Sequence, residues 1–204
     1  MRISWLGHAC FVVEHNDYRV VIDPFCDVPG YRDVKVEADK VLCSHGHFDH
    51  AYTDGVVLRE GKESPFTVET VETFHDDREG TLRGMNTVHI LRTDDLTVVH
   101  LGDLGHVLAE EQAAKLRGCD VLMIPVGGTY TVDAAGAAQI VEMIHPRVLI
   151  PMHYRGDGFG FDNIDTVAPF LTYFPAGKVR HAADNVLEMT GKTTAHVAVL
   201  RRPV

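Results

Sequence analysis

The sequence predicts an α/β (α+β) fold in which two β-sheets pack face to face and helices cover the outside. The first half of the chain is patterned as strands, whereas strands and helices alternate in the second half. A weak internal repeat relates the halves, because each contains one strand that ends in an acidic residue and a later strand that ends in a histidine. Two similar layered halves bury their apolar faces best against each other.

Turn residues separate the expected strands of the first half. Gly7-His8 and Asn16-Asp17 interrupt the apolar runs, and Asp23-Pro24 ends the third run because proline cannot donate to a β-ladder. Residues 26–38 lack a strand pattern and are expected to form a loop. The strands expected in this half cover 3–6, 10–14, 18–22, 40–44, 65–74, 86–93 and 96–101, with Asp94-Asp95 as the last hairpin turn.

Helices alternate with strands in the second half. The expected helices cover 108–117, 133–145 and 164–174. Gly118 and Pro146 end the first two. In the third, Asp165 is the expected N-cap, which places Pro169 in the first turn, where N–H groups have no helical partner. The strands expected here cover 120–126, 147–152, 185–190 and 194–200.

Length and composition place the chain among globular proteins. Its 204 residues suffice for one compact domain spanning 1–204, and neither a linker nor a low-complexity segment divides them. The apolar stretches are far shorter than the roughly 20 residues that span a membrane. The N-terminus opens into a strand rather than a secretory signal. We therefore expect a cytoplasmic protein without a membrane span, whose four cysteines are reduced.

The charge of the chain disfavours a nucleic-acid partner. The formal net charge is -10 with histidine neutral, and an acidic surface repels phosphate backbones. Bound divalent cations would offset part of this charge locally. We expect a small-molecule substrate, and the sequence leaves a homo-oligomer open.

The loop 45–50 carries the strongest chemical signal, since it reads His-Gly-His-Phe-Asp-His. Three imidazoles and a carboxylate in six residues would repel one another if the histidines were charged, and coordination to a cation removes that problem. In an extended loop, His45 and His47 project to the same side and can share one metal. Asp49 and His50 lie past a bend and can take another. The alternative is an accidental polar loop.

This motif, H-x-H-x-D-H, resembles that of the metallo-β-lactamase superfamily. The acid-ended strand at Asp23 precedes it, and Gly102-Asp103 and Pro151-Met152-His153 match the later motifs of the family. More closely, the chain resembles small predicted metal-dependent hydrolases related to L-ascorbate-6-phosphate lactonase and to the phospholipase D that cleaves N-acyl-phosphatidylethanolamine. The segments that carry this closer resemblance are 5–8, 22–25, 100–106 and 126–131. The resemblance implies a four-layer αββα metallo-β-lactamase sandwich.

The resemblance also implies a set of ligands for two metals. The first metal would be held by His45, His47 and His75, the second by Asp49, His50 and His153, with Asp103 bridging them. His75 follows an expected strand, which is a common place for a ligand. His89 and His100 lie inside expected strands and are interpreted as packed or supporting residues.

Further residues are expected to support the site. His8, Asp23 and Asp49 are assigned to the catalytic apparatus. A ligating imidazole usually donates its other N–H to a carboxylate or carbonyl group, and Asp23 has the sequence position for that role. For His8 and His106 the alternative is a turn histidine that faces water. Three residues on loops after strands are assigned to the substrate mouth, although a solvated loop is the alternative for them: Tyr130, Tyr154 and Arg155.

These assignments predict a metal-dependent hydrolase that uses a two-metal-activated hydroxide on a small ester, lactone or phosphoester. Asp49 would ligate a metal and orient the hydroxide. The expected cofactors are two divalent ions, with Zn²⁺ favoured over Mn²⁺ or Fe²⁺. The alternatives are a phosphodiesterase or nuclease on the same scaffold, a redox protein of the flavodiiron type, and a non-catalytic metal-binding sensor module.

Overall fold

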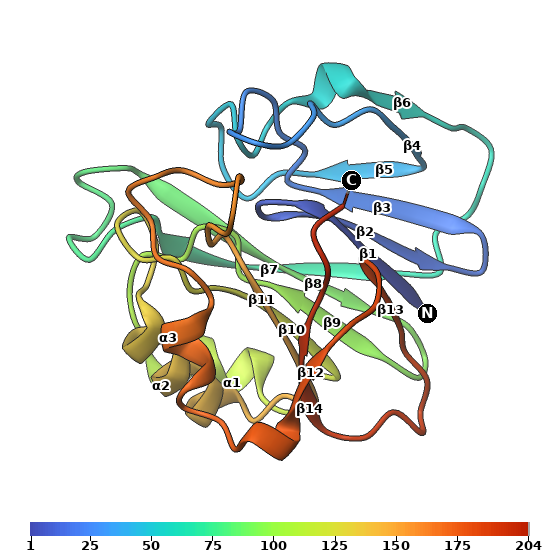
Figure 1. The fold of residues 1–204 in the computed structure, drawn as a ribbon. Helices are drawn as coiled ribbons and strands as arrows, with labels where there is room; N and C mark the ends of the chain where they lie inside the picture. Colours follow the sequence, from blue (N-terminus) through green and yellow to red (C-terminus); the bar gives the residue numbers. More distant parts are fainter. Residues whose placement is uncertain (204) are drawn as a thin grey trace.

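Two large β-sheets form the body of the molecule in a computed structural model that describes residues 1–203 (Figure 1). The smaller sheet has the order β13-β1-β2-β3-β5. Its strands β1, β2 and β3 form an antiparallel meander. The second turn falls at Asn16-Asp17, as predicted, whereas the first falls at His8-Ala9, one residue after the predicted Gly7-His8, because Gly7 still pairs with Cys10. The strands of this sheet are β1 (Arg2–Gly7), β2 (Cys10–His15), β3 (Tyr18–Ile22), β5 (Lys40–Leu42) and β13 (Val186–Glu188).

The larger sheet has seven strands in the order β12-β14-β11-β10-β9-β8-β7. Neighbouring pairs are antiparallel from β7 to β9 and parallel from β9 to β12. Every residue of β10 and β11 is buried, because both faces of these central strands are covered. The strands are β7 (Thr67–Phe74), β8 (Met85–Arg92), β9 (Thr97–His100), β10 (Val121–Pro125), β11 (Val148–Met152), β12 (Val179–His181) and β14 (His196–Val199).

The main core lies between the sheets and extends under the helices. Along β2, Phe11 and Val13 point into this core, whereas Cys10 and Val12 belong to a second cluster on the outer face of the same sheet. Helices cover the outer face of the larger sheet (Figure 1). They are α1 (Glu110–Leu116), α2 (Ala134–Ile144) and α3 (Ala168–Leu171), followed by the 3-10 turn η2 (Ala176–Lys178). The predicted α/β sandwich with two sheets face to face is therefore confirmed as the fold class.

The outer layer over the smaller sheet is thinner than the helical layer. It consists of the short paired strands β4 (Val36–Ala38) and β6 (Val56–Leu58), the 3-10 turn η1 (Thr53–Gly55) and connecting loops (Figure 1). Phe25 and Val34 of this layer pack with Cys10 and Val12 of the sheet. Part of the segment 26–38, expected to be loop throughout, is thus a strand, and three residues are too few for a recognisable period.

One predicted helix is much shorter than expected. α3 covers four residues and its N-cap is Val167, so Asp165 does not cap it, although Pro169 does lie in its first turn. The backbone around Asp165 is extended instead, because its N–H donates to Gly127 O at 2.7 Å and its carbonyl accepts from Arg155 N at 3.0 Å. The helix expected over 133–145 is confirmed, with Asp133 accepting a capping hydrogen bond from Gly136 N.

Three further strands differ from the prediction. β6 and β12 were not predicted, since each has only three residues. The strand expected over 40–44 ends at Leu42, and Ser44 N instead donates to the side chain of Asp23 at 2.6 Å. All four cysteines are free, as expected. Among the described helices, none has the length and hydropathy that crossing a membrane requires. The single-domain assignment stays a prediction.

Candidate metal centre

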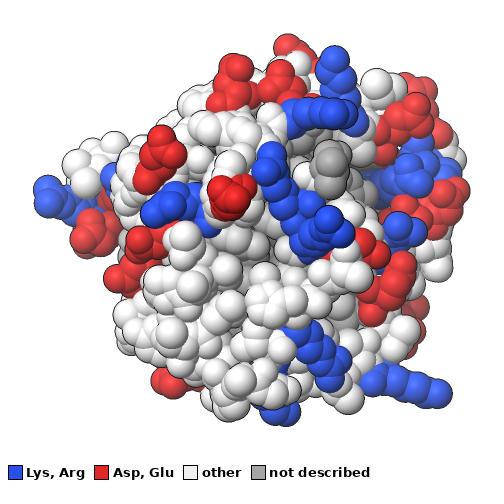
Figure 2. Space-filling model, in the orientation of Figure 1, with Lys and Arg blue, Asp and Glu red and all other residues white. Residues whose placement is uncertain are grey.

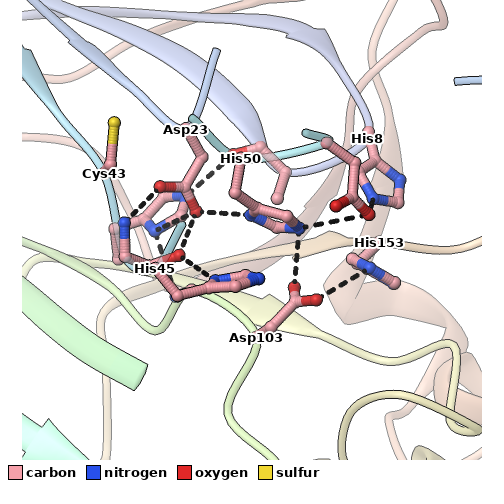
Figure 3. Close-up of polar contacts among 12 residues, drawn as sticks. His8, Asp23, Cys43, His45, His50, Asp103 and His153 are labelled. Atoms are coloured by element: carbon pink, nitrogen blue, oxygen red, sulfur yellow. Dashed lines mark hydrogen bonds and ion pairs between the residues drawn. The ribbon is translucent and has the colours of Figure 1, made fainter. Parts of the chain in front are cut away.

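Histidines and aspartates gather where strands of both sheets end. His8 follows β1, Asp23 follows β3, and His75 directly follows β7. Asp103 and His153 follow β9 and β11, so each half of the molecule contributes both acids and imidazoles. The loop 45–50 leaves β5 and enters the same space. Figure 3 shows these side chains converging, with His50 between Asp23 and Asp103.

A first group of three imidazoles faces the open side of this space. Its members are His45, His47 and His75, and one ring nitrogen of each lies within 4.8 Å of the others. The ring centroids of His45 lie 4.5 Å from those of both His47 and His75. His75 is buried whereas His47 is exposed, so the group connects the interior with the surface. Three imidazole nitrogens are a common ligand set for a divalent ion.

A second group lies deeper. Asp49, His50 and His153 form it together with His8, and their ligand atoms also lie within 4.8 Å of one another. His8 Nε2 is 3.3 Å from Asp49 Oδ2. The backbone carbonyl of His8 accepts hydrogen bonds from the Trp5 indole at 3.0 Å and from His153 N at 3.2 Å. His8 is thus more central than a turn histidine that faces water.

Asp103 lies between the two groups. Its Oδ1 is 3.2 Å from His50 Nε2, and its Oδ2 is 3.2 Å from His153 Nε2 and 3.6 Å from His75 Nε2. The backbone is held in place by Asn86, whose side-chain oxygen accepts a hydrogen bond from Asp103 N at 2.8 Å. Sequence analysis missed Asn86, which lies inside β8 and carries no motif.

Several buried polar atoms in this space have no hydrogen-bond partner within the described chain. They include His45 Nε2, His50 Nε2, both ring nitrogens of His8 and of His153, His75 Nδ1 and Asp103 Oδ1. Leaving one such group unsatisfied costs about 1–3 kcal/mol, and natural proteins rarely leave several together. A divalent cation would satisfy nitrogen and carboxylate oxygen atoms at once. The residues present therefore fit a metal centre.

The residues of this space shift one another's pKa values in the metal-free chain. Burial would raise the pKa of Asp103, but His153 and His50 hold it well below its ordinary value. Burial would lower the pKa of His50, but Asp103 and Asp23 raise it well above its ordinary value. Burial and the neighbouring imidazoles lower the pKa of His8 and of His45 to about 3, so both are neutral and can ligate.

Asp23 acts on His50 rather than on the open space. Its Oδ1 accepts from Ser44 N at 2.6 Å, and its Oδ2 accepts from Ser44 Oγ at 2.7 Å and lies 2.8 Å from His50 Nδ1. This contact leaves His50 Nε2 pointing toward Asp103 (Figure 3). A carboxylate behind a ligating imidazole is the arrangement that fixes its tautomer and ring orientation.

Three residues of the site have a left-handed backbone. The φ angles of His8, Asp23 and His153 are 50°, 51° and 52°. Residues other than glycine rarely adopt this region. Each residue directly follows a strand or its turn. Strained backbone of this kind clusters at functional sites, where the surrounding structure holds it.

The other histidines have supporting or remote positions. His89 lies inside β8 and its Nε2 donates to Cys43 O at 3.1 Å, just before the ligand loop. His100 ends β9, and its Nε2 donates to Ala9 O at 2.8 Å. His106 accepts from Phe74 N at 3.2 Å and so supports the end of β7. Both His89 and His100 are buried, as predicted.

A hollow of about 420 Å³ opens onto the metal centre. Tyr130 lines it, as expected for a substrate-mouth residue, but Tyr154 and Arg155 do not. Tyr154 is 5% exposed, and its ring centroid lies 5.6 Å from that of Trp5 with the rings tilted. Arg155 is exposed, and its Nε donates to Ile164 O at 2.7 Å. The lining residues are His47, Phe48, Asp49, His75, Arg83, Asp103, Tyr130 and Phe161. Sequence analysis missed the roles of Phe48, Arg83 and Phe161.

Known proteins match this sequence and this fold. Residues 2–153 match the β-lactamase superfamily domain. A UPF0173 metal-dependent hydrolase of Archaeoglobus fulgidus is 31% identical over 76% of this chain and 84% of its own length. A UPF0173 protein of Pyrococcus furiosus is 34% identical over 76% of this chain and 83% of its own length.

A solved structure agrees over nearly the whole chain. It is a metallo-β-lactamase-superfamily protein of Thermotoga maritima, whose description proposes a Zn-dependent hydrolase. Its TM-score is 0.75 at 31% identity, with 98% of this chain and 97% of that chain covered. By these sequence matches and the shared fold, the chain belongs to the UPF0173 metal-dependent hydrolases of the metallo-β-lactamase superfamily.

Proposed function

We propose that this metal-dependent hydrolase holds two divalent ions and cleaves a small ester, lactone or phosphoester. His45, His47 and His75 would hold the first ion, and Asp49, His50 and His153 the second. Asp103 would bridge them. The observation that carries the proposal is the set of buried, unpartnered nitrogen and oxygen atoms on both sides of the Asp103 carboxylate.

When bound, two such ions lower the pKa of a shared water and polarise the bond to be cleaved. The chain's own residues then have separate tasks. Asp23 fixes the ring of His50 through Nδ1, so that the other nitrogen faces the centre. Asp49, whose Oδ2 lies 3.3 Å from His8 Nε2, would ligate a metal and would orient the water that attacks. Hydrolysis consumes one water, breaks one ester bond, and yields an acid and an alcohol.

The native metal is proposed from the donor types. Imidazole nitrogens with carboxylate oxygens suit Zn²⁺, and they also bind Mn²⁺ or Fe²⁺. The chain offers no cysteine ligand in either group, since its members are histidine and aspartate.

A small-molecule substrate is favoured over nucleic acid. Lys and Arg are intermingled with Asp and Glu over the upper part of the face in Figure 2, and much of its lower part carries neither. With a net charge of -10, duplex DNA would be repelled at physiological salt. DNA binding in the micromolar range that weakens steeply with salt would instead support the nuclease alternative.

Elemental analysis combined with a hydrolysis screen tests the proposal. Protein purified without chelator and reconstituted should approach two equivalents of metal per chain. The same protein should hydrolyse at least one of three substrate sets: aryl esters, lactones, and bis-aryl phosphodiesters. Metal content near zero after reconstitution would overturn the metal assignment. Two bound metals without any hydrolysis would favour the sensor alternative.

A further inference from the structure

We infer that Arg83 recognises an anionic group of the substrate, a carboxylate or a phosphate, beside the metal centre. The inference rests on the proposed hydrolase function and deepens it. Arg83 is the one arginine, and no lysine accompanies it, among the residues given above as lining the hollow over the metal centre. The other wall residues, outside the candidate ligands, are aromatic: Phe48, Tyr130 and Phe161.

The guanidinium of Arg83 is held in position by an aromatic ring, and no carboxylate neutralises its charge. Its Cζ lies 5.5 Å from the centroid of the Tyr130 ring, within the range of a cation–π contact. Tyr130 is itself fixed, because its hydroxyl accepts from Asn163 Nδ2 at 2.7 Å. Among residues 1–203, no carboxylate lies within 4.0 Å of the Arg83 side-chain nitrogens, and these nitrogens donate to no protein acceptor. The planar donors are therefore free for a ligand.

The loop that carries Arg83 is built as a rigid unit. The carboxylate of Asp76, which is 1% exposed, accepts four backbone hydrogen bonds at 2.8–2.9 Å. The donors are the N–H groups of Arg78, Gly80, Leu82 and Arg83 itself. Since Asp76 follows the candidate ligand His75, this arrangement ties the position of Arg83 to the metal centre.

The chemistry of the wall defines a substrate class. Arginine binds carboxylates and phosphates through two parallel N–H donors, which gives geometric selectivity as well as affinity. The aromatic rings favour an apolar body, and Phe48 is 54% exposed at the rim. The substrate is therefore a small amphipathic anion. Its cleaved bond would lie over the metal centre and its charged group would contact Arg83.

Two chromogenic esters that differ only in charge provide the test. Mono-4-nitrophenyl succinate carries a carboxylate where 4-nitrophenyl butyrate carries a methyl group. The metal-loaded protein should show about 10-fold higher kcat/KM for the succinate, the size expected of one charge-assisted hydrogen bond. Arg83→Gln should abolish this preference by raising KM for the succinate about 10-fold, while the butyrate changes less than about 2-fold. Arg83→Lys should restore part of the preference.

Arg78→Gln is the matched control. Arg78 is exposed on the same loop, does not line the hollow, and its replacement changes the net charge equally. It should leave both esters unaffected. The inference is overturned if Arg78→Gln matches Arg83→Gln, if Arg83→Gln impairs both esters alike, or if the wild type prefers the butyrate.

Binding separates this inference from the proposed function. Calorimetry with the amide analogues, succinanilic acid and butyranilide, needs no turnover. If neither ester is hydrolysed but succinanilic acid binds about 10-fold more weakly to Arg83→Gln, the hydrolase proposal fails and the anion site stands. If succinanilic acid binds wild type and Arg83→Gln equally, or binds neither, the anion site is refuted whatever the esters show.

Discussion

Two buried carboxylates in the two halves of the molecule have opposite surroundings. Asp23 follows β3 and Asp103 follows β9, and both contact the ring of His50. Both oxygens of Asp23 accept hydrogen bonds, from Ser44 N and Ser44 Oγ, and Oδ2 also contacts His50 Nδ1. Asp103 Oδ1 has no such partner in the described chain, and its carboxylate lies among three Nε2 atoms.

This difference shows that aspartate has two separate roles in the site. A carboxylate whose oxygens are all occupied can only orient its neighbour, as Asp23 orients His50. A buried carboxylate oxygen without a hydrogen bond costs free energy, and a divalent cation that binds this oxygen together with the nearby imidazole nitrogens would remove that cost. The internal repeat thus places an orienting acid in one half and a candidate ligand in the other.

Asp103→Asn should have the largest effect. Asparagine keeps the size but removes the charge that offsets two cations, so the second ion should bind more weakly and the shared water should be less acidic. We expect kcat and kcat/KM to fall together by about two orders of magnitude or more, with the fold retained. Steady-state kinetics and elemental analysis measure this. Near-normal turnover with two metals retained would make Asp103 a turn residue.

His75→Ala and His89→Ala should also differ widely. His75 Nε2 lies 3.6 Å from Asp103, and its loss should remove metal and activity. His89 donates to Cys43 O behind the ligand loop, so its loss should mainly lower the Tm. Metal content and thermal denaturation of both variants check the pair. The reverse pattern would assign the third imidazole of the first group to His89.

Asp23→Asn should be milder than Asp103→Asn. It leaves every candidate ligand in place but weakens the contact that fixes His50, which should lower metal affinity by about 10–100-fold. Competition with a chromophoric chelator measures the affinity. Excess metal should largely restore the activity of Asp23→Asn but not that of Asp103→Asn. Equal losses of activity in the two variants at saturating metal would contradict the separate roles of Asp23 and Asp103.

A third carboxylate, Asp39, should show the smallest effect because it lies away from the metal centre. Burial raises its pKa, but hydrogen bonds from Arg59 and Arg19 N more than offset this and lower it below 3.8. A depressed pKa stabilises the fold above the ordinary carboxylate pKa, and this stability is lost as the pH falls. Asp39→Asn should lower Tm by ~3 °C at neutral pH.

Acidic pH should remove the difference in Tm between wild type and Asp39→Asn. The Tm gap between wild type and Asp39→Asn should shrink as the pH falls below 3.8, the ordinary value of the carboxyl group. Metal content and kcat should not change at neutral pH. Loss of metal in this variant would mean that the outer layer, and not only Asp23, holds the ligand loop in place.

The sequence predicted the parts of the site that depend on local patterns. The loop 45–50 is recognisable by spacing alone, and His75 by its place at a strand end. Asn86 could not be predicted in this way, because only the pairing of β7, β8 and β9 brings its side chain to Thr73 Oγ1, Leu101 O and Asp103 N. Such contacts arise from sheet register and tertiary packing, which one sequence does not display.

The substrate side was harder to predict for the same reason. Tyr154 and Arg155 follow a strand, as substrate residues often do, yet aromatic packing takes Tyr154 into the interior. Arg83 had no motif, and its position depends on the backbone hydrogen bonds around Asp76. The proposed relation to ascorbate-6-phosphate lactonase and the cytoplasmic location stay predictions.

The hydrogen bond from the Trp5 indole to the carbonyl of His8 has a practical consequence. Trp5 is the single tryptophan of the chain, and the same carbonyl accepts from His153 N. Its fluorescence therefore comes from one indole that is directly coupled to the backbone of the deeper ligand group. We expect the emission to change as metal occupies that group, so that loading can be followed in the unlabelled protein without any substrate.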